Sequence, residues 1–248
     1  MTTQFTTLIF VLLTLMSAEC RLSYNKKRQL MFTQSKTKVV PTAENMRILG
    51  KAAGFAVLAG SKTLNEGLTT ITGSLGVSPG TDISGTSVTL IDGEFHSADA
   101  VSAGAQADAT TAYIKLSKMI APKDMTGKDL GGLTIPPGEY HYTSSCFLSE
   151  GILTLDAQGD ANAQWVFKIV STLITGRNTK VIMKNGGNLL NVYWLVGSSA
   201  TFKAGTEMVG NVLAYASISF GKHVLLRGRA LARTAAVTML SNTIKIEA

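Results

Sequence analysis

The sequence contains few of the residues from which metal sites, disulfide frameworks and active sites are built. Its 248 residues include 2 cysteines and 3 histidines, and only 16% of them are charged and 7% aromatic. The histidines, His96, His141 and His223, are far apart, and neither they nor the cysteines follow a ligand spacing. The composition therefore predicts no bound metal and no cofactor, and a core built from small and aliphatic side chains.

Positive charge is concentrated in one short stretch. The formal net charge is +7, but six bases and no acid lie between Cys20 and Ala43. From Glu44 onward the chain has 17 bases and 15 acids, which is too even a balance for a surface that follows phosphates. We predict that residues 21–43 form a basic, disordered linker and that nucleic acid is not a partner.

Residues 1–20 have the layout of a secretory signal peptide. An apolar run from Leu8 to Met16 is followed by small residues, and cleavage is expected between Ala18 and Cys20. The run is too short to span a bilayer as a helix. We therefore expect a secreted protein. An uncleaved apolar anchor is the alternative, because no basic residue precedes the run.

Two motifs suggest enzymes, and both lack residues that the chemistry needs. "GVSPG" has the Gly-x-Ser-x-Gly spacing of a nucleophile elbow, but Ser78 is followed by Pro79, which has no N–H for an oxyanion hole. "DAQGDAN" alternates like a calcium loop, but Ala161 and Phe167 stand where an EF-hand requires glycine and glutamate. We interpret the first motif as a corner and the second as a polar turn. We predict neither enzymatic activity nor a small-molecule substrate.

The C-terminal half contains a repeat of 18 to 20 residues. Three pieces, 191–210, 211–228 and 229–246, each hold three short β-rich runs, and a longer piece that begins at Trp165 fits the same template. Three strands in a repeat of this length predict a triangular β-solenoid, in which each coil pairs only with its neighbours.

The middle strand of each coil alternates between an inward apolar position and outward small side chains. The outward positions carry no charge, although solvent-facing strands normally carry Lys and Glu. We therefore interpret them as one functional face. The inward row is Leu173, Ala200, Ile218 and Val237; the outward columns are Thr172, Ser199, Ser217 and Ala236, and Ile174, Thr201, Ser219 and Thr238.

One long helix is predicted between the two β-rich halves, over about residues 97–121. Ser97 is the expected N-cap, and Pro122 ends the helix. An apolar stripe rich in alanine recurs at steps of three and four, which predicts that the helix lies along one side of the solenoid. The stripe consists of Val101, Ala105, Ala109, Ala112, Leu116 and Ile120.

The chain resembles the family of microbial ice-binding, or antifreeze, proteins. The likeness is carried, in this order, by "LGKAAGFAVLAG", "ITGSLGVSPG", "LGGLTIPPGEYHYTSS", "LTLDAQGDANAQWVFKI", "NVYWLVGSSATF", "GNVLAYASISF" and "LRGRALARTAAVTMLSNTI". It implies a mainly β fold for residues 44–248: a right-handed, triangular, discontinuous β-helix with one long flanking α-helix. It also implies that one flat face binds an ice crystal surface. We place the two outward columns on that face, with Thr70 and Thr72 as an N-terminal extension, and we expect a monomer.

Two other kinds of β-solenoid are alternatives for the same residues. A polysaccharide lyase or hydrolase needs clustered carboxylates in a groove, and the sequence offers none beyond the polar turn. A surface adhesin or glycan-binding solenoid without catalysis would use exposed aromatics, but Trp165 and Trp194 lie in β-rich runs and are predicted to be core residues. The adhesin stays the alternative function, and dimerisation through the flat face stays the alternative to a monomer.

Overall fold

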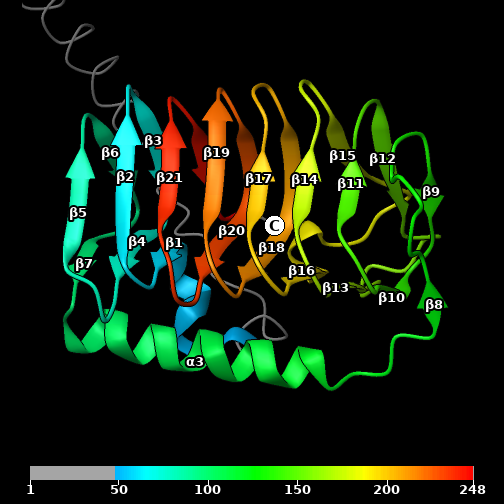
Figure 1. Cartoon of the computed structure of the whole chain (residues 1–248), viewed down its shortest axis with the longest axis horizontal. Coiled ribbons are helices and arrows are strands. Elements are labelled where there is room, and N and C mark those ends of the chain that lie inside the picture. The colour runs from blue at the N-terminus through cyan, green and yellow to red at the C-terminus, as the bar shows by residue number, and fades with distance from the viewer. Residues whose placement is uncertain (1–47, 248) are drawn as a thin grey trace, which may run out of the picture. The chain divides into compact units, whose positions relative to one another are not determined.

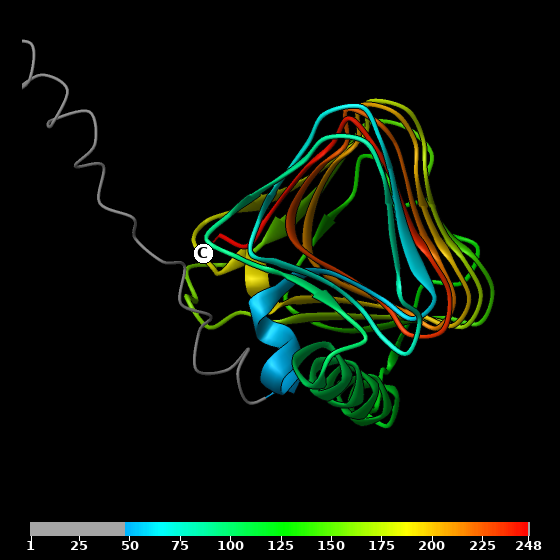
Figure 2. The ribbon, with the colours of Figure 1, turned by 90° about the vertical axis from the view of Figure 1, so that its left-hand side faces the viewer.

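A computed structural model describes residues 48–247, and the predicted signal peptide and linker lie outside these residues. The described residues form a β-helix of triangular cross-section with one long helix beside it (Figures 1 and 2). All its strand pairs are parallel, and each coil pairs with the coils next to it. The predicted mainly β, triangular solenoid is therefore confirmed.

One side of the triangle is a separate seven-stranded sheet, and we call its outer surface the seven-stranded face. Its strands are the row nearest the viewer in Figure 1. Their order along the stack is β11 (Cys146–Leu148), β14 (Leu173–Thr175), β17 (Ala200–Phe202), β19 (Ile218–Lys222), β21 (Val237–Leu240), β2 (Lys62–Glu66) and β5 (Asp82–Gly85).

A second, 15-stranded sheet forms the other two sides. Strands β18 (Glu207–Ala214) and β20 (Leu225–Ala232) turn from one side into the other at Gly210 and Gly228, which are paired and have φ values of 97° and 149°. The helix-covered side also contains β8 (Lys123–Asp124), β10 (Gly138–Tyr142), β13 (Trp165–Ile169), β16 (Val192–Val196), β1 (Phe55–Ala59), β4 (Ser74–Val77) and β7 (Phe95–Ser97). The remaining side, which we call the charged side, contains β9 (Thr134–Ile135), β12 (Ile152–Asp156), β15 (Lys180–Lys184), β22 (Thr243–Lys245), β3 (Thr69–Thr72) and β6 (Val88–Ile91).

The coils are not stacked in chain order. Strands β1, β2 and β3 of the first coil pair with β20, β21 and β22, which come last in the sequence. After β7 the chain leaves this end of the stack, follows α3 along the molecule and re-enters at β8 (Figure 1). The discontinuous order that the family resemblance implied is confirmed.

The corner after the seven-stranded sheet is built in the same way in each coil. One residue per coil takes a left-handed backbone conformation, which turns the chain sharply into the charged side. Buried polar side chains satisfy groups at this corner: Thr175 Oγ1 lies 2.8 Å from Thr206 Oγ1, and Asn242 Nδ2 donates to Gly221 O at 2.7 Å. The left-handed residues are Gly67, Ser87, Gly151, Asn178, Gly205, His223 and Ser241.

Stacked aromatic rings fill part of the interior. Phe167 lies between Tyr140 and Trp194, with ring centroids 5.3 Å and 4.2 Å apart. Trp165 and Trp194 are fully buried, and their indole N–H groups donate to Ile135 O and to the carbonyl oxygen of residue 209. The prediction that both tryptophans are core residues is confirmed.

Helix α3 (Ala100–Ser117) is shorter than predicted, and its N-cap is Asp99 rather than Ser97. The Asp99 carboxylate accepts a hydrogen bond of 2.7 Å from Ser102 N. Ser97 is instead the last residue of β7 and donates its hydroxyl to Thr81 O. Since β7 runs to residue 97, the helix cannot begin there.

The apolar stripe of α3 is buried only in its middle. Val101 is 50% exposed, and Ile120, which lies beyond the end of the helix, is 85% exposed, so these two residues do not belong to the packed stripe. The alanines let the helix lie close to the sheet, where Leu213 and Leu231 meet it. The buried members are Ala105, Ala109, Ala112 and Leu116.

Two short 3-10 helices complete the fold, η1 (Gly50–Gly54) before β1 and η2 (Leu189–Asn191) before β16. Within residues 48–247 no helix has the length and apolar character needed to cross a membrane. The "GVSPG" segment ends β4 and turns a corner, as interpreted. Gly80 is required there because a Cβ would lie 1.7 Å from Ser61 O.

Candidate functional site

The predicted outward columns lie on the seven-stranded face, in the predicted register. Thr201 pairs with Ile174 on one side and with Ser219 on the other, and Ser219 pairs with Thr238. Each of these four side chains is partly exposed. The row beneath them is closed to solvent, since Leu173, Ala200, Ile218 and Val237 are each at most 1% exposed.

The hydroxyl groups of the other column hold one another in place. Ser217 Oγ donates to Ser199 Oγ at 2.9 Å, and Thr172 Oγ1 donates to Ser145 Oγ at 2.8 Å. These bonds join neighbouring strands, which lie about 4.8 Å apart in a sheet. Each bond fixes the rotamers of two side chains, so the column presents ordered oxygen atoms. Ala236, directly before β21, ends this column and adds no polar group.

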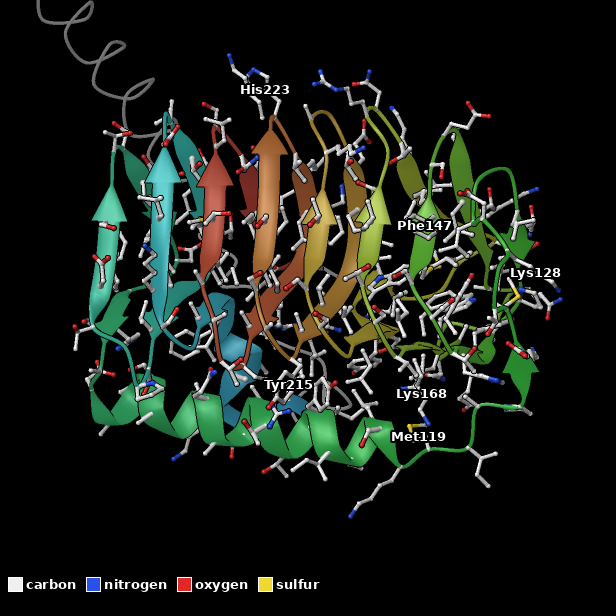
Figure 3. All side chains as sticks on the ribbon, viewed as in Figure 1. Met119, Lys128, Phe147, Lys168, Tyr215 and His223 are labelled. Atoms are coloured by element: carbon white, nitrogen blue, oxygen red, sulfur yellow. The ribbon has the colours of Figure 1, made fainter. Side chains whose placement is uncertain are left out.

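Further residues, which were not predicted from the sequence, extend these columns at both ends. Phe147, 43% exposed, pairs with Ile174 at one end, and Leu64 pairs with Thr238 at the other. Ser84 follows Leu64 on β5. The signal for β11 was the alternation of "SCFL", which matches "TLIT" on β14 in register. Figure 3 shows Phe147 on this side of the stack.

Charged residues bound the face but do not interrupt its centre. Lys62 pairs with Asp82 where the face reaches β2 and β5. The exposed bases Arg177, Lys203 and Lys222 lie where β14, β17 and β19 end. The two columns are therefore free of charge over five strands, β11, β14, β17, β19 and β21.

The placement of Thr70 and Thr72 on this face was wrong. Both belong to β3, which pairs with β22 and β6 on the charged side. Thr70 lies beside Thr243, and Thr72 lies beside Lys245. The strand of the first coil that does continue the seven-stranded face is β2, one corner earlier in the chain.

The other two sides have different surfaces. The helix-covered side is hidden by α3, whose alanines pack on Leu213 and Leu231. The charged side carries ion pairs: Lys180 Nζ lies 2.7 Å from Glu207 Oε1, and both Arg227 and Lys245 contact Glu247 at 3.1 and 2.7 Å. Among the three sides that residues 48–247 form, only the seven-stranded face combines exposure with a charge-free centre.

The face holds no group suited to acid–base or nucleophilic chemistry in its columns. Cys146 lies beneath it, and burial raises the pKa of its thiol to about 12, which keeps the sulfur protonated. In the "DAQGDAN" segment, Asp156 and Asp160 accept hydrogen bonds from backbone N–H groups two residues on, as a polar turn does. No cluster of three potential metal-ligating side chains occurs within residues 48–247.

Comparison with known proteins shows consistent similarity to one family. A family model described as ice-binding-like matches residues 57–245. An ice-binding protein of Nostoc sp. (strain HG1) is 47% identical over 203 residues, which are 82% of this chain and 75% of that protein.

Solved structures show the same likeness. The crystal structure of an ice-binding protein from an Antarctic biological consortium aligns with a TM-score of 0.76 and 45% identity, covering 79% of this chain and 89% of its own. That of an ice-binding protein from the Antarctic ascomycete Antarctomyces psychrotrophicus aligns with a TM-score of 0.74 and 37% identity, covering 81% and 98%.

Proposed function

Because this chain belongs to the ice-binding-like protein family, we propose that it binds ice and that the seven-stranded face is its ice-binding surface. The contact consists of the two columns over β11, β14, β17, β19 and β21. The residues of this surface are Ser145, Thr172, Ser199, Ser217 and Ala236, and Phe147, Ile174, Thr201, Ser219 and Thr238.

One observation carries the proposal: this is the exposed side whose centre has regular small side chains and no charge. Ice presents a periodic lattice of water without charge and without a pocket. A charged side chain orders water around itself, whereas a flat row of hydroxyl and methyl groups can hold water in a lattice-like layer. The bonded hydroxyls of Ser199 and Ser217 cannot rotate freely, so less entropy is lost when they order water.

The mechanism follows from adsorption over an area. Thr201 and Thr238 each present a methyl and a hydroxyl group, and β-branching restricts their χ1 angles. The methyl groups favour cage-like water, and the hydroxyl groups anchor it. An ordered layer on this face can join the crystal, and ice then grows only as curved, less stable surface between the bound molecules. Growth and recrystallisation are inhibited without any chemical step.

This mechanism needs neither catalysis nor a cofactor, and a single chain can perform it. We therefore include in the proposal that the protein acts as a secreted monomer without enzymatic activity. Secretion is supported by the layout of residues 1–20, with its apolar run and small residues. The partner in this proposal is the ice crystal surface alone.

Substitution of Thr201 or Thr238 by Tyr tests the face. A phenol ring would stand above the plane of the column and keep neighbouring side chains from the crystal. We expect each variant to need at least about tenfold more protein to arrest recrystallisation, a loss near 1.4 kcal/mol of adsorption free energy. The measurement is the coarsening of ice crystals under a cryomicroscope, with circular dichroism as the test of folding.

Thr70→Tyr is the matched control. Thr70 is also a partly exposed threonine in a parallel strand, but it lies on the charged side. We expect its activity to stay within about twofold of the wild-type protein. Full activity of both face variants, or an equal loss in the control, would show that ice is bound elsewhere.

A further inference from the structure

A hollow outside the seven-stranded face lies between the end of α3 and the ends of β13 and β16. Its volume is about 370 Å³, and Tyr113, Ser117, Lys168, Val170 and Gly197 are among its lining residues. Figure 3 shows Lys168 near the C-terminal end of the helix. Pockets for small ligands begin at about 300 Å³, so this space suits a single ring.

Three polar groups of the hollow keep unused hydrogen-bonding capacity. Lys168 Nζ donates one bond, to Met119 O at 2.7 Å, which leaves two N–H donors on the ammonium. Ser117 Oγ donates to Ile114 O, and Tyr113 Oη donates to the carbonyl oxygen of residue 196, so both oxygens keep lone pairs. Burial raises the pKa of Tyr113, so its hydroxyl stays protonated. The set suits a ligand with several hydroxyl groups and an anionic group.

The hollow also has apolar walls, which no side chain of the neighbouring coil covers. Val170 is 67% exposed at the corner after β13. In the next coil the equivalent corner is Gly197, where a Cβ would lie 2.2 Å from Val170 O, so no side chain can cover the valine from there. The ring of Tyr113 forms another wall. Flat aromatic and branched aliphatic surfaces of this kind pack against the C–H face of a sugar ring.

The charge at the hollow favours an anion. Lys168 lines it, and the Arg233 guanidinium lies 4.5 Å from the centroid of the Tyr113 ring. None of the residues that line the hollow is acidic. A carboxylate placed beside Lys168 would therefore be attracted by the ammonium and would not be repelled by any acidic side chain in the lining.

We propose that this hollow binds one hexuronate residue, with the carboxylate on Lys168, the hydroxyl groups on Ser117 and Tyr113, and the ring against Val170. The ligand is either the free sugar acid or a unit of an acidic polysaccharide. The proposal is independent of ice binding, because none of these side chains belongs to the two columns.

The test is a titration of the full chain with glucuronate, followed by amide chemical shifts in two-dimensional NMR. We expect saturation at millimolar concentration, with the largest shifts at Ser117 and Gly197. Glucose tests the need for the carboxylate, and acetate tests the need for the sugar ring. The proposal is overturned if glucuronate does not saturate, or if either control ligand binds as tightly as glucuronate.

A glucuronate-containing oligosaccharide distinguishes the two sources. Binding at least about tenfold tighter than the monomer assigns the site to a polysaccharide, and equal affinity assigns it to the free acid. Val170→Asp, on an exposed side chain, should weaken binding of either form at least about tenfold, whereas Val170→Asn, which removes the same apolar contact but adds no charge, should weaken it by only about threefold. Equal binding by wild type and Val170→Asp, or an equal loss in Val170→Asn, would contradict the charge argument. Ice recrystallisation should be unchanged in both variants.

Discussion

At the residue scale, Arg229 is a buried cation that joins two distant parts of the chain. Its Nε and Nη2 donate to Ala53 O at 3.0 and 2.8 Å, and its Nη1 donates to Asn211 Oδ1 at 2.7 Å. Burial lowers the pKa of the guanidinium to about 10, so it remains charged at neutral pH. The bonds to residue 53 tie η1, near the start of the described chain, to the coil of β20.

Arg229→Met should destabilise the protein strongly. The methionine fills much of the volume but leaves two buried acceptors without donors, which costs about 1–3 kcal/mol for each. Arg227→Met is the control, because Arg227 forms an exposed ion pair with Glu247 and such pairs contribute at most about 1 kcal/mol. Urea unfolding followed by circular dichroism measures both variants, and equal midpoints would refute the importance of the buried contacts.

Single residues also show what the sequence could and could not predict. The alternation in "SATF" and "SISF" places Thr201 and Ser219 outward. Because neighbouring repeats have nearly equal lengths, these two residues also lie side by side on the same side of the triangle. "TTIT" alternates just as regularly, yet Thr70 faces the charged side. Alternation tells inside from outside, but the side of the triangle depends on the number of corners that the chain has passed. The N-terminal half repeats as well, since Thr69 pairs with Val88 and Leu75 pairs with Phe95, but too few coils precede the helix for the period to be visible in the sequence.

At the element scale, the N-terminus of α3 couples stability to pH. The pKa of Asp99 is lowered to about 2, first by the hydrogen bond from the Ser102 backbone and then by the His96 side chain, whose Nδ1 lies 2.7 Å from Asp99 Oδ2. A carboxyl group with a depressed folded-state pKa stabilises the fold above its unfolded value, near 3.8. This stabilisation is lost as the pH falls from about 4 to 2.

Asp99→Asn isolates that contribution. Asparagine caps helices as well as aspartate does, but it does not titrate. We expect the melting temperature of the wild-type protein to fall more steeply between pH 4 and pH 2 than that of the variant. Thermal melts at several pH values measure the difference, and parallel curves would show that the Asp99 charge contributes nothing in this range.

The helix also shows how far an element can be predicted. Its buried alanine stripe was visible as a period of three and four residues, and Ala105, Ala109 and Ala112 are buried as expected. The start of the helix was not visible in the sequence, because Ser97 and Asp99 are both good N-caps. The pairing of β7 with β4 decides between them. That pairing joins distant segments and leaves no local signal.

At the scale of the whole molecule, the distribution of charge predicts how ice binding responds to salt. Raising the ionic strength from about 0.01 M to 0.15 M shortens the Debye length from about 30 Å to about 8 Å. A surface without charge does not depend on that screening. We expect the gap between melting and freezing points, measured at each salt concentration, to stay within about 1.5-fold. Uronate binding at Lys168 should weaken over the same range.

If most of the gap between melting and freezing points were lost at the higher salt concentration, charged residues, such as the bases at the strand ends, would contact ice. Lys62→Gln and Lys203→Gln would then show which border of the face causes the salt dependence. If each retained the wild-type salt response, the dependence would have to come from other charged residues, such as Arg177 and Lys222 at the strand ends or those of the charged side, since Lys62 and Lys203 bound the face on β2 and after β17.

The stacking of β2 on β21 also sets the order in which the molecule can be completed during translation. The N-terminal coils leave the ribosome first, yet the strands that they pair with are the last to be made. Until then, β1, β2 and β3 each have one strand edge without a hydrogen-bonded neighbour, and the last C-terminal coil that has been made has three such strand edges. A message truncated before β20 would therefore yield two stacks of coils with unpaired strand edges between them, rather than a slightly shorter rod.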